Sequence, residues 1–159
     1  MPSISPYEVA VVVAHAALAG IGVWLLVIDA RTHRLPNRIV LPTLGVLLVL
    51  VTVDALAAGQ WASSVRAALG LVVLGGFYAV LRMVSRAGMG GGDVKLAAVI
   101  GLVLGWHGWQ ALMIGAASAF VLGALYALVL ILLRRADGTT RIAFGPWMIA
   151  GAFLGVAFG

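Results

Sequence analysis

The sequence predicts an all-α membrane protein, a polytopic bundle of about six transmembrane helices in a single domain covering residues 1–159. Two features of composition support this fold class: 64% of the residues are hydrophobic and only 9% are charged. A soluble domain usually carries about 25% charged residues. The third observation is arrangement, because the charged residues gather in short gaps between long apolar runs. The chain therefore lacks the polar surface that a water-soluble fold needs.

Six apolar runs define the predicted helices, because a spanning helix needs about 20 apolar residues. The first run carries no charge, and no Lys or Arg precedes it, so it is predicted to be a retained helix rather than a signal peptide. The fourth run is short and follows a glycine-rich turn, and the fifth is long enough to span with tilt. In chain order, the predicted segments are Val9–Ile28, Ile39–Ala58, Val65–Leu81, Val94–Gly105, Gly108–Leu133 and Ile142–Phe158.

The basic residues predict the orientation of the bundle. They lie in or beside alternate gaps between the segments: Arg31, Arg34 and Arg38; Arg82, Arg86 and Lys95; and Arg134, Arg135 and Arg141. Of the ten basic residues, only Arg66, near the start of the third segment, belongs to the other side. Loops rich in Lys and Arg stay in the cytoplasm. We therefore expect a multi-pass protein of the inner (cytoplasmic) membrane, with both termini extracytoplasmic.

Several chemistries are excluded or unsupported by the residue types present. The chain has no cysteine, which excludes disulfides, zinc–thiolate sites and cysteine catalysis. The excess of basic charge is explained by the membrane orientation, so nucleic acid is not an expected partner. His15 and His107 have no partners at the spacing of metal ligands, and no metal or cofactor is expected.

Glycine spacing predicts close helix packing. Gly101 and Gly105, and likewise Gly151, Gly155 and Gly159, follow the GxxxG spacing that lets membrane helices approach closely. The isolated glycines, Gly45 and Gly70 among them, are also interpreted as packing positions.

Five acidic residues are present, and two of them lie at predicted cytoplasmic helix ends. Asp29 ends the first segment and Asp93 begins the fourth, so folding could bring them together at one depth. A carboxylate at the membrane boundary is costly and is a functional candidate. Glu8 and Asp137 are interpreted as solvated or turn residues, and Asp54 as a helix-pairing or snorkelling residue.

Two carboxyl groups that share one proton suit peptide hydrolysis, because one can accept a proton from water while the other donates to the scissile carbonyl. Negative charge is favoured at a helix N-terminus, so Asp93 is the expected base and Asp29 the expected acid. The residues alone leave an alternative open. Asp29 could pair with Arg31 or Arg34, and Asp93 could simply cap its helix.

Three motifs in order carry a family resemblance. Gly90-Gly91-Gly92-Asp93 followed by Val94-Lys95-Leu96 matches the GxGD-x-K-L signature of the type IV prepilin peptidases. Asp29 with the following basic loop and Leu35-Pro36-Asn37 resembles the first aspartate motif of that family. Ile142-Ala143-Phe144-Gly145-Pro146 resembles its final-helix P-F-G-P motif, with Ala143 in place of the first proline.

The resemblance implies a polytopic aspartic protease that needs no metal and removes the basic leader of prepilins or pseudopilins at the cytoplasmic face. Members that also methylate the new N-terminus with S-adenosylmethionine carry a cytoplasmic domain with CxxC pairs. This chain has no such pairs, so it resembles the short, peptidase-only form. The residues carried over are the catalytic Asp29 and Asp93, and the substrate-binding or supporting Gly90, Gly91, Gly92, Lys95, Pro36 and Asn37.

Two rival functions remain open at this point. The first is another GxGD intramembrane protease, such as a preflagellin- or presenilin-like enzyme, which would keep both aspartates and cut other substrates. The second is a small transporter or membrane scaffold that uses the aspartates for ion binding and has no proteolytic activity.

Overall fold

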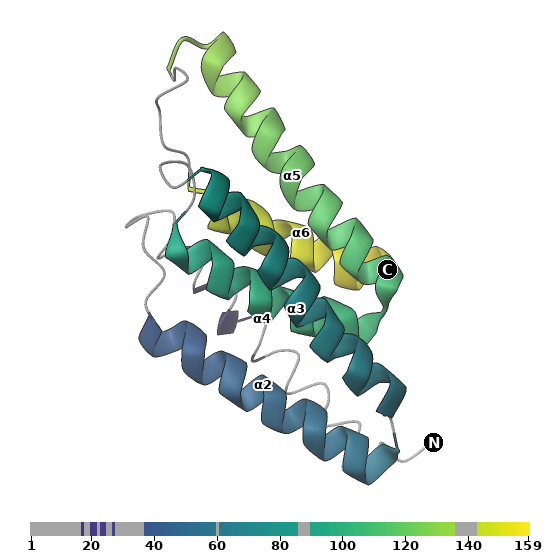
Figure 1. Ribbon diagram of the computed structural model, residues 1–159. Coiled ribbons are helices and arrows are strands. Elements are labelled where there is room, and N and C mark those ends of the chain that lie inside the picture. The colour runs from purple at the N-terminus through teal and green to yellow at the C-terminus, as the bar shows by residue number, and fades with distance from the viewer. Residues whose placement is uncertain are drawn as a thin grey trace.

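The computed structural model describes residues 17, 20, 21, 23, 24, 27, 37–59, 61–85, 90–135 and 143–159. Every element with defined bounds among them is an α-helix, so the predicted all-α class is confirmed. The helices, labelled as in Figure 1, are α2 (Asn37–Ala58), α3 (Trp61–Val84), α4 (Gly91–His107), α5 (Trp109–Leu132) and α6 (Gly145–Phe158).

Five of the six predicted segments correspond to these helices. The prediction for the fourth segment began three residues late, because α4 already begins at Gly91, ahead of the apolar run. Pro146 lies in the first turn of α6, where a missing backbone N–H costs nothing. The first predicted segment, Val9–Ile28, lies mostly outside the described residues.

Length and hydropathy identify two of the described helices, α3 and α5, as able to cross a membrane. The stretch Arg38–Val53 and helix α6 are apolar but shorter. The full topology of six spans, with both termini outside, stays a prediction.

Helix α4 lies at the centre of the bundle and contacts α2, α3, α5 and α6. From Leu96 to Trp106 it is apolar on every side, which is the pattern of a helix enclosed by others. Its buried residues include Leu96, Ala97, Leu102 and Leu104. Because α4 is enclosed, its first turn is held in place by the helices around it.

Glycines bring α3 and α4 into backbone contact. A Cβ atom added at Gly70 would lie 3.0 Å from the Cα atom of Gly105 and would also meet the carbonyl oxygen of Gly101. A Cβ atom at Gly105 would lie 2.6 Å from the carbonyl oxygen of Arg66. The predicted packing role of Gly70, Gly101 and Gly105 is confirmed, and the pairing makes the two helices antiparallel.

The second close pair is α5 and α6, which are also antiparallel. A Cβ atom at Gly151 would lie 2.5 Å from the carbonyl oxygen of Gly115, and one at Gly155 would lie 2.5 Å from that of Ala111. Among the described residues, a Cβ atom at Gly45 meets nothing within 4 Å, so the packing role of Gly45 stays a prediction.

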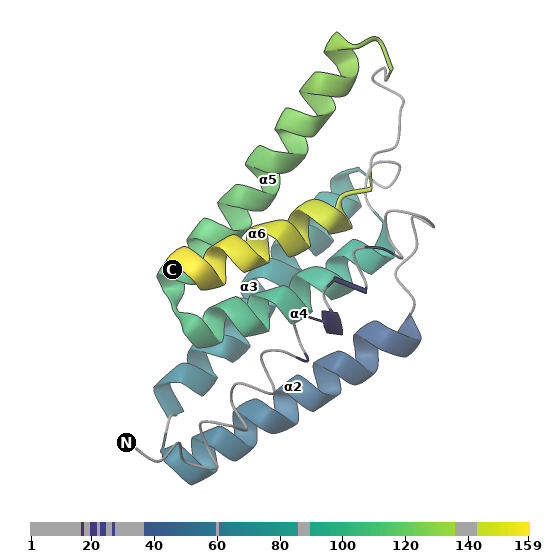
Figure 2. The same ribbon diagram turned by 180° about the vertical axis from the view of Figure 1, so that it is seen from behind.

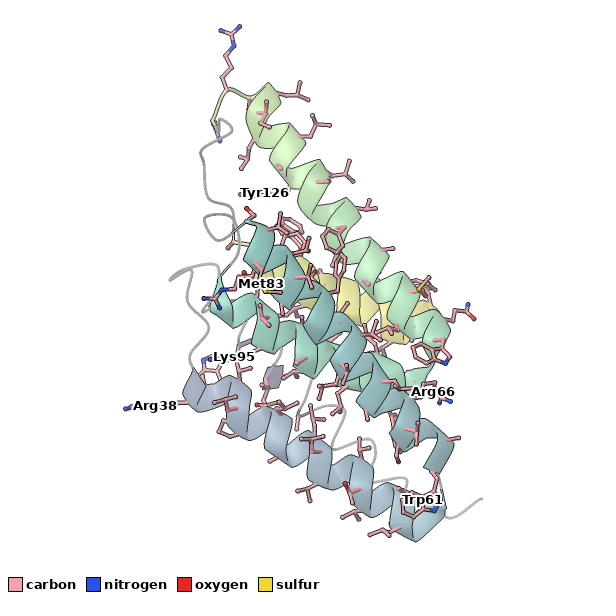
Figure 3. The ribbon with its side chains drawn as sticks, viewed as in Figure 1. Arg38, Trp61, Arg66, Met83, Lys95 and Tyr126 are labelled. Carbon is pink, nitrogen blue, oxygen red and sulfur yellow. The ribbon has the colours of Figure 1, made fainter. Side chains whose placement is uncertain are left out.

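One end of the molecule gathers the start of α2, the end of α3 and the starts of α4 and α6, as Figure 1 and the reverse view in Figure 2 both show. Figure 3 places Arg38 and Lys95 at this end, and Arg66 together with Trp61 at the other. The predicted separation of Arg66 from these basic residues is therefore present in the described part of the chain. We call the end with Arg38 and Lys95 the basic end.

At the opposite end, Arg66 of α3 closes the last turn of α4. Its Nε atom donates to the carbonyl oxygen of Gly105 at 3.0 Å, and its Nη2 atom donates to the carbonyl oxygen of Trp106 at 3.1 Å. These carbonyls have no partners within their own helix, and a cation there also opposes the negative end of the helix dipole.

We expect Arg66→Met to lower the free energy of unfolding by about 2 kcal/mol, because charge-assisted hydrogen bonds to two carbonyls are lost. Thermal unfolding of the purified protein in detergent measures the change. Arg38→Met is the matched control, since Arg38 is exposed at the start of α2, and a change within about 0.5 kcal/mol is expected. Equal losses for both variants would contradict the capping role of Arg66.

Candidate active site

The glycine-rich segment and Asp93 form the first turn of α4. The backbone N–H of Gly90 donates a hydrogen bond of 2.9 Å to Oδ2 of Asp93. Asp93 is half-buried, and its carboxylate is held at the N-terminus of a helix, where negative charge is stabilised. The capping contact weighed in the sequence analysis is therefore real. This hydrogen bond uses one acceptor position on Oδ2, and a carboxylate can accept several hydrogen bonds.

Gly91 provides space for the end of the neighbouring helix. A Cβ atom at Gly91 would lie 2.9 Å from Cζ of Arg82, so the guanidinium group lies directly against the glycine backbone. Gly90 itself has an extended backbone, with φ −75° and ψ 156°, which other residues also adopt. A glycine is therefore needed at position 91 because a side chain there would have no space. The close approach of the two helices places the positive charge of Arg82 beside the turn that holds Asp93.

An aromatic cluster lies beside this turn. Tyr78 of α3 is 1% exposed, and its ring centroid lies 5.8 Å from that of Phe120 and 6.0 Å from that of Phe144. The cluster joins α3, α5 and Phe144, the residue that precedes α6.

The folding of α6 also brings the final-helix motif, which includes Phe144, near the α3 helix that packs on the GxGD turn. Phe144 packs on Phe120 with ring centroids 5.3 Å apart, and a Cβ atom at Gly123 would lie 2.8 Å from the Phe144 ring. Gly145, the first residue of α6, is buried. Residues some fifty positions apart in the chain therefore meet around the Asp93 turn because α5 and α6 fold back on α3 and α4.

The remaining predicted site residues are only partly covered by the structure. Lys95 is half-buried in the first turns of α4 and lies at the basic end, as Figure 3 shows. Asn37 is the first residue of α2. Asp29 and Pro36 lie outside the described residues, so the meeting of Asp29 with Asp93 stays a prediction. Among the described residues, no group of three or more His, Cys, Asp or Glu side chains could hold a metal ion.

Comparison with known proteins decides the family. The sequence pattern that defines the type IV leader peptidase family matches residues 16–128 of the chain. The chain belongs to this family. The match includes the positions of Asp29 and Asp93 and ends before Phe144.

Individual members of the type IV leader peptidase family agree with this assignment. The chain is 36% identical over 138 residues to the prepilin leader peptidase/N-methyltransferase of Escherichia coli strain K12, covering 84% of the chain and 58% of the relative. It is 35% identical over 138 residues to the protein of that name from Bacillus subtilis strain 168, covering 84% and 50%. For the Stutzerimonas stutzeri protein, the identity is 30% over 136 residues, covering 83% and 45%.

The chain thus spans about half the length of the curated leader peptidase relatives that it matches. No solved structure matches the chain.

Two residues at the candidate site were not predicted as site residues. Arg82 was interpreted only through its charge, and Tyr78 was not singled out at all. One available signal is spacing, because Gly75, Tyr78 and Arg82 recur at helical intervals and so share one face of α3. That signal becomes informative only when the face of α3 that meets α4 is known.

Proposed function

We propose that the chain is a membrane-embedded aspartic endopeptidase that removes the basic leader of type IV prepilins or pseudopilins, with Asp29 and Asp93 as its catalytic pair. The observation that carries the proposal is membership of the type IV leader peptidase family, combined with the placement of Asp93 in a helix-capping turn. The proposal covers peptide hydrolysis. The methyl-transfer activity in the names of the relatives is not included, because the chain aligns with about half of their length.

The proposed reaction uses one shared proton. Ionised Asp93 removes a proton from a water molecule, whose oxygen forms a bond to the scissile carbonyl carbon. Protonated Asp29 gives its proton to the carbonyl oxygen, which yields a neutral tetrahedral diol. The diol then returns its hydroxyl proton to Asp29, the C–N bond breaks, and the leaving amine takes the proton held by Asp93. Two carboxyl groups can divide these roles when their environments separate their proton affinities.

The helix ends favour this division of roles. Asp93 lies at a helix N-terminus, where the dipole stabilises the charged form, and the guanidinium group of Arg82 adds positive charge beside the turn. In the predicted topology, Asp29 lies at a helix C-terminus, where the dipole favours the protonated form. We assign Gly90, Gly91 and Gly92 to the approach of the substrate backbone.

We further propose that the basic end faces the cytoplasm, because Arg38, Arg82 and Lys95 gather there in the described part of the chain. The substrate leader would then meet the site from the side on which prepilins are made. Lys95 is proposed to offset a negative side chain on the mature side of the cut. Pro36 and Asn37 would shape the loop between Asp29 and α2.

Co-expression of the full chain with a candidate prepilin tests the function. We expect the prepilin to lose its leader, seen as a faster band on a gel and as a new N-terminus by mass spectrometry. Prepilins that stay intact with a well-expressed, folded chain would contradict the proposal. Cleavage of a preflagellin in place of a prepilin would favour the rival protease class, and cation flux in vesicles without cleavage would favour the transporter.

A further inference from the structure

Arg82 is an exposed cation that lies against the glycine-rich turn at the start of α4. A Cβ atom added at Gly91 would lie 2.9 Å from Cζ and 3.2 Å from Nη2 of Arg82, and it would also meet Nη1. Its three nearest neighbours would therefore all belong to one guanidinium group. Arg82 is exposed, so this group lies on the turn without being enclosed there. The space beside Gly91 is thus filled by a side chain of α3 that a ligand can still reach.

The packing of α3 on α4 determines where the guanidinium group lies. A Cβ atom at Gly75 would lie 3.1 Å from Cβ of Ala98, so these two positions face each other. Arg82 follows Gly75 by about two helical turns, and Gly91 precedes Ala98 by about two turns on the antiparallel partner. The same register therefore places Arg82 opposite Gly91. Because the glycine contacts between the two helices allow little sliding, this placement is a fixed feature of the pair.

The chemistry of the guanidinium group suits the backbone of an extended peptide. The group carries five N–H donors in a planar fork, has no acceptor and stays charged. An extended peptide presents carbonyl oxygens that have no partner of their own, and leaving them unpaired beside the hydrocarbon core is costly. The basic side chains of a leader are repelled by a cation, whereas its backbone carbonyl oxygens are neutral acceptors.

We propose that Arg82 is a substrate-binding residue whose guanidinium group donates hydrogen bonds to backbone carbonyl oxygens of the prepilin segment extended across the start of α4. Position 91 is then a glycine because Arg82 has to lie against it. The inference rests on the proposed function, since it names a binding group for the same substrate. Asp93 keeps its separate role, because its Oδ2 atom accepts the hydrogen bond from the N–H of Gly90 at 2.9 Å.

The experiment measures kcat and KM of the purified full chain in detergent with a prepilin substrate. Arg82→Met removes the donors and keeps an unbranched side chain. We expect KM to rise about tenfold and kcat to stay within about twofold, because the lost hydrogen bonds hold the bound substrate and the transition state equally. Arg82→Lys keeps the charge without the planar fork, so KM should rise only about threefold. A fall in kcat with KM unchanged would assign the effect to proton transfer and overturn the inference.

Gly91→Ala tests the position of the guanidinium group. The added Cβ atom would fall where that group lies, and only the end of a flexible side chain has to move, so the protein should still fold. We expect KM to rise about as much as in Arg82→Met. In the Arg82→Met background, Gly91→Ala should change KM by less than about twofold, because the group that it displaces is already absent. A full further rise in the double variant would show that the substrate itself needs the space at Gly91, which would overturn the inference.

Arg38→Met is the matched charge control. It removes the same charge from the same end of the molecule, at an exposed position of α2 that Figure 3 shows. Both kinetic constants should stay at their wild-type values. An equal rise of KM in Arg38→Met and Arg82→Met would show that the net charge of the basic end matters, and not the contact of Arg82 with the turn.

Melting temperatures in detergent show whether each variant is folded. If Arg82→Met does not fold, Arg82→Lys and Gly91→Ala answer the same question, since both keep a long cationic side chain at position 82. An unchanged KM in these two variants overturns the role of Arg82. A wild-type chain that cuts no prepilin overturns the proposed function instead, so the two failures are distinguishable.

Discussion

Asp93→Asn and Asp29→Asn should each reduce prepilin cleavage by at least about 10³-fold, because each removes one of the two groups that move the proton. In Asp93→Asn the amide oxygen can still accept the hydrogen bond from the N–H of Gly90, so the helix cap is retained. The loss should therefore appear in kcat, while the melting temperature in detergent changes little. Initial rates from a gel-based leader-removal assay measure the effect.

Asp54→Asn is the matched control for these variants. It makes the same chemical change at an acidic residue in α2 that is predicted to be near the outer end of its helix, and it should cut prepilin at the wild-type rate. Activity retained in Asp29→Asn or in Asp93→Asn would remove the proposed pair. Equal loss in all three variants would point to a general effect of removing charge.

The second large effect is expected at the contact between α3 and α4. A Cβ atom at Gly101 would lie 2.8 Å from the carbonyl carbon of Gly70 and 2.9 Å from Cβ of Leu74. Backbone atoms cannot move aside unless the helices separate. We therefore expect Gly101→Val to lower the free energy of unfolding by about 3 kcal/mol and to reduce the yield of folded protein.

Gly76→Ala provides the control within the same helix pair. In the part of the chain that the structure describes, a Cβ atom at Gly76 meets nothing within 4 Å, so the substitution should be neutral or stabilising by up to about 1 kcal/mol. Thermal unfolding of both variants in detergent measures the difference. A Gly101→Val protein as stable as the wild type would show that α3 and α4 do not pack through these glycines.

Much of the architecture could be predicted from local sequence. Uninterrupted apolar runs have few low-energy alternatives to a helix when water is absent, because each backbone N–H and C=O then needs a partner within the chain. The positions of helices such as α3 and α5 follow from this requirement. The predicted start of α4 was late because the glycines ahead of Val94 weaken helix propensity, while the Asp93 cap restores the first turn.

The chemistry of the candidate site was only partly predictable. The GxGD segment identified Asp93, since a carboxylate is costly at the membrane boundary and therefore conspicuous. Tyr78 carries no comparable signal, because a tyrosine in an apolar helix is unremarkable until its neighbours are known. The space that Arg82 requires at Gly91 also arises between two helices, and no spacing within either helix encodes it.

The sequence by itself determined the helical class, the gathering of basic residues in alternate gaps, and the leader peptidase motifs. These features depend on residue type and on short spacings along the chain. The tertiary structure decided that Gly70 and Gly101 are contacts between helices, and that Tyr78 packs beside Phe144 of the final-helix motif. The physical reason is that helices apolar on every side can present any face to a neighbour, and only the fit of backbones and side chains across the bundle selects one.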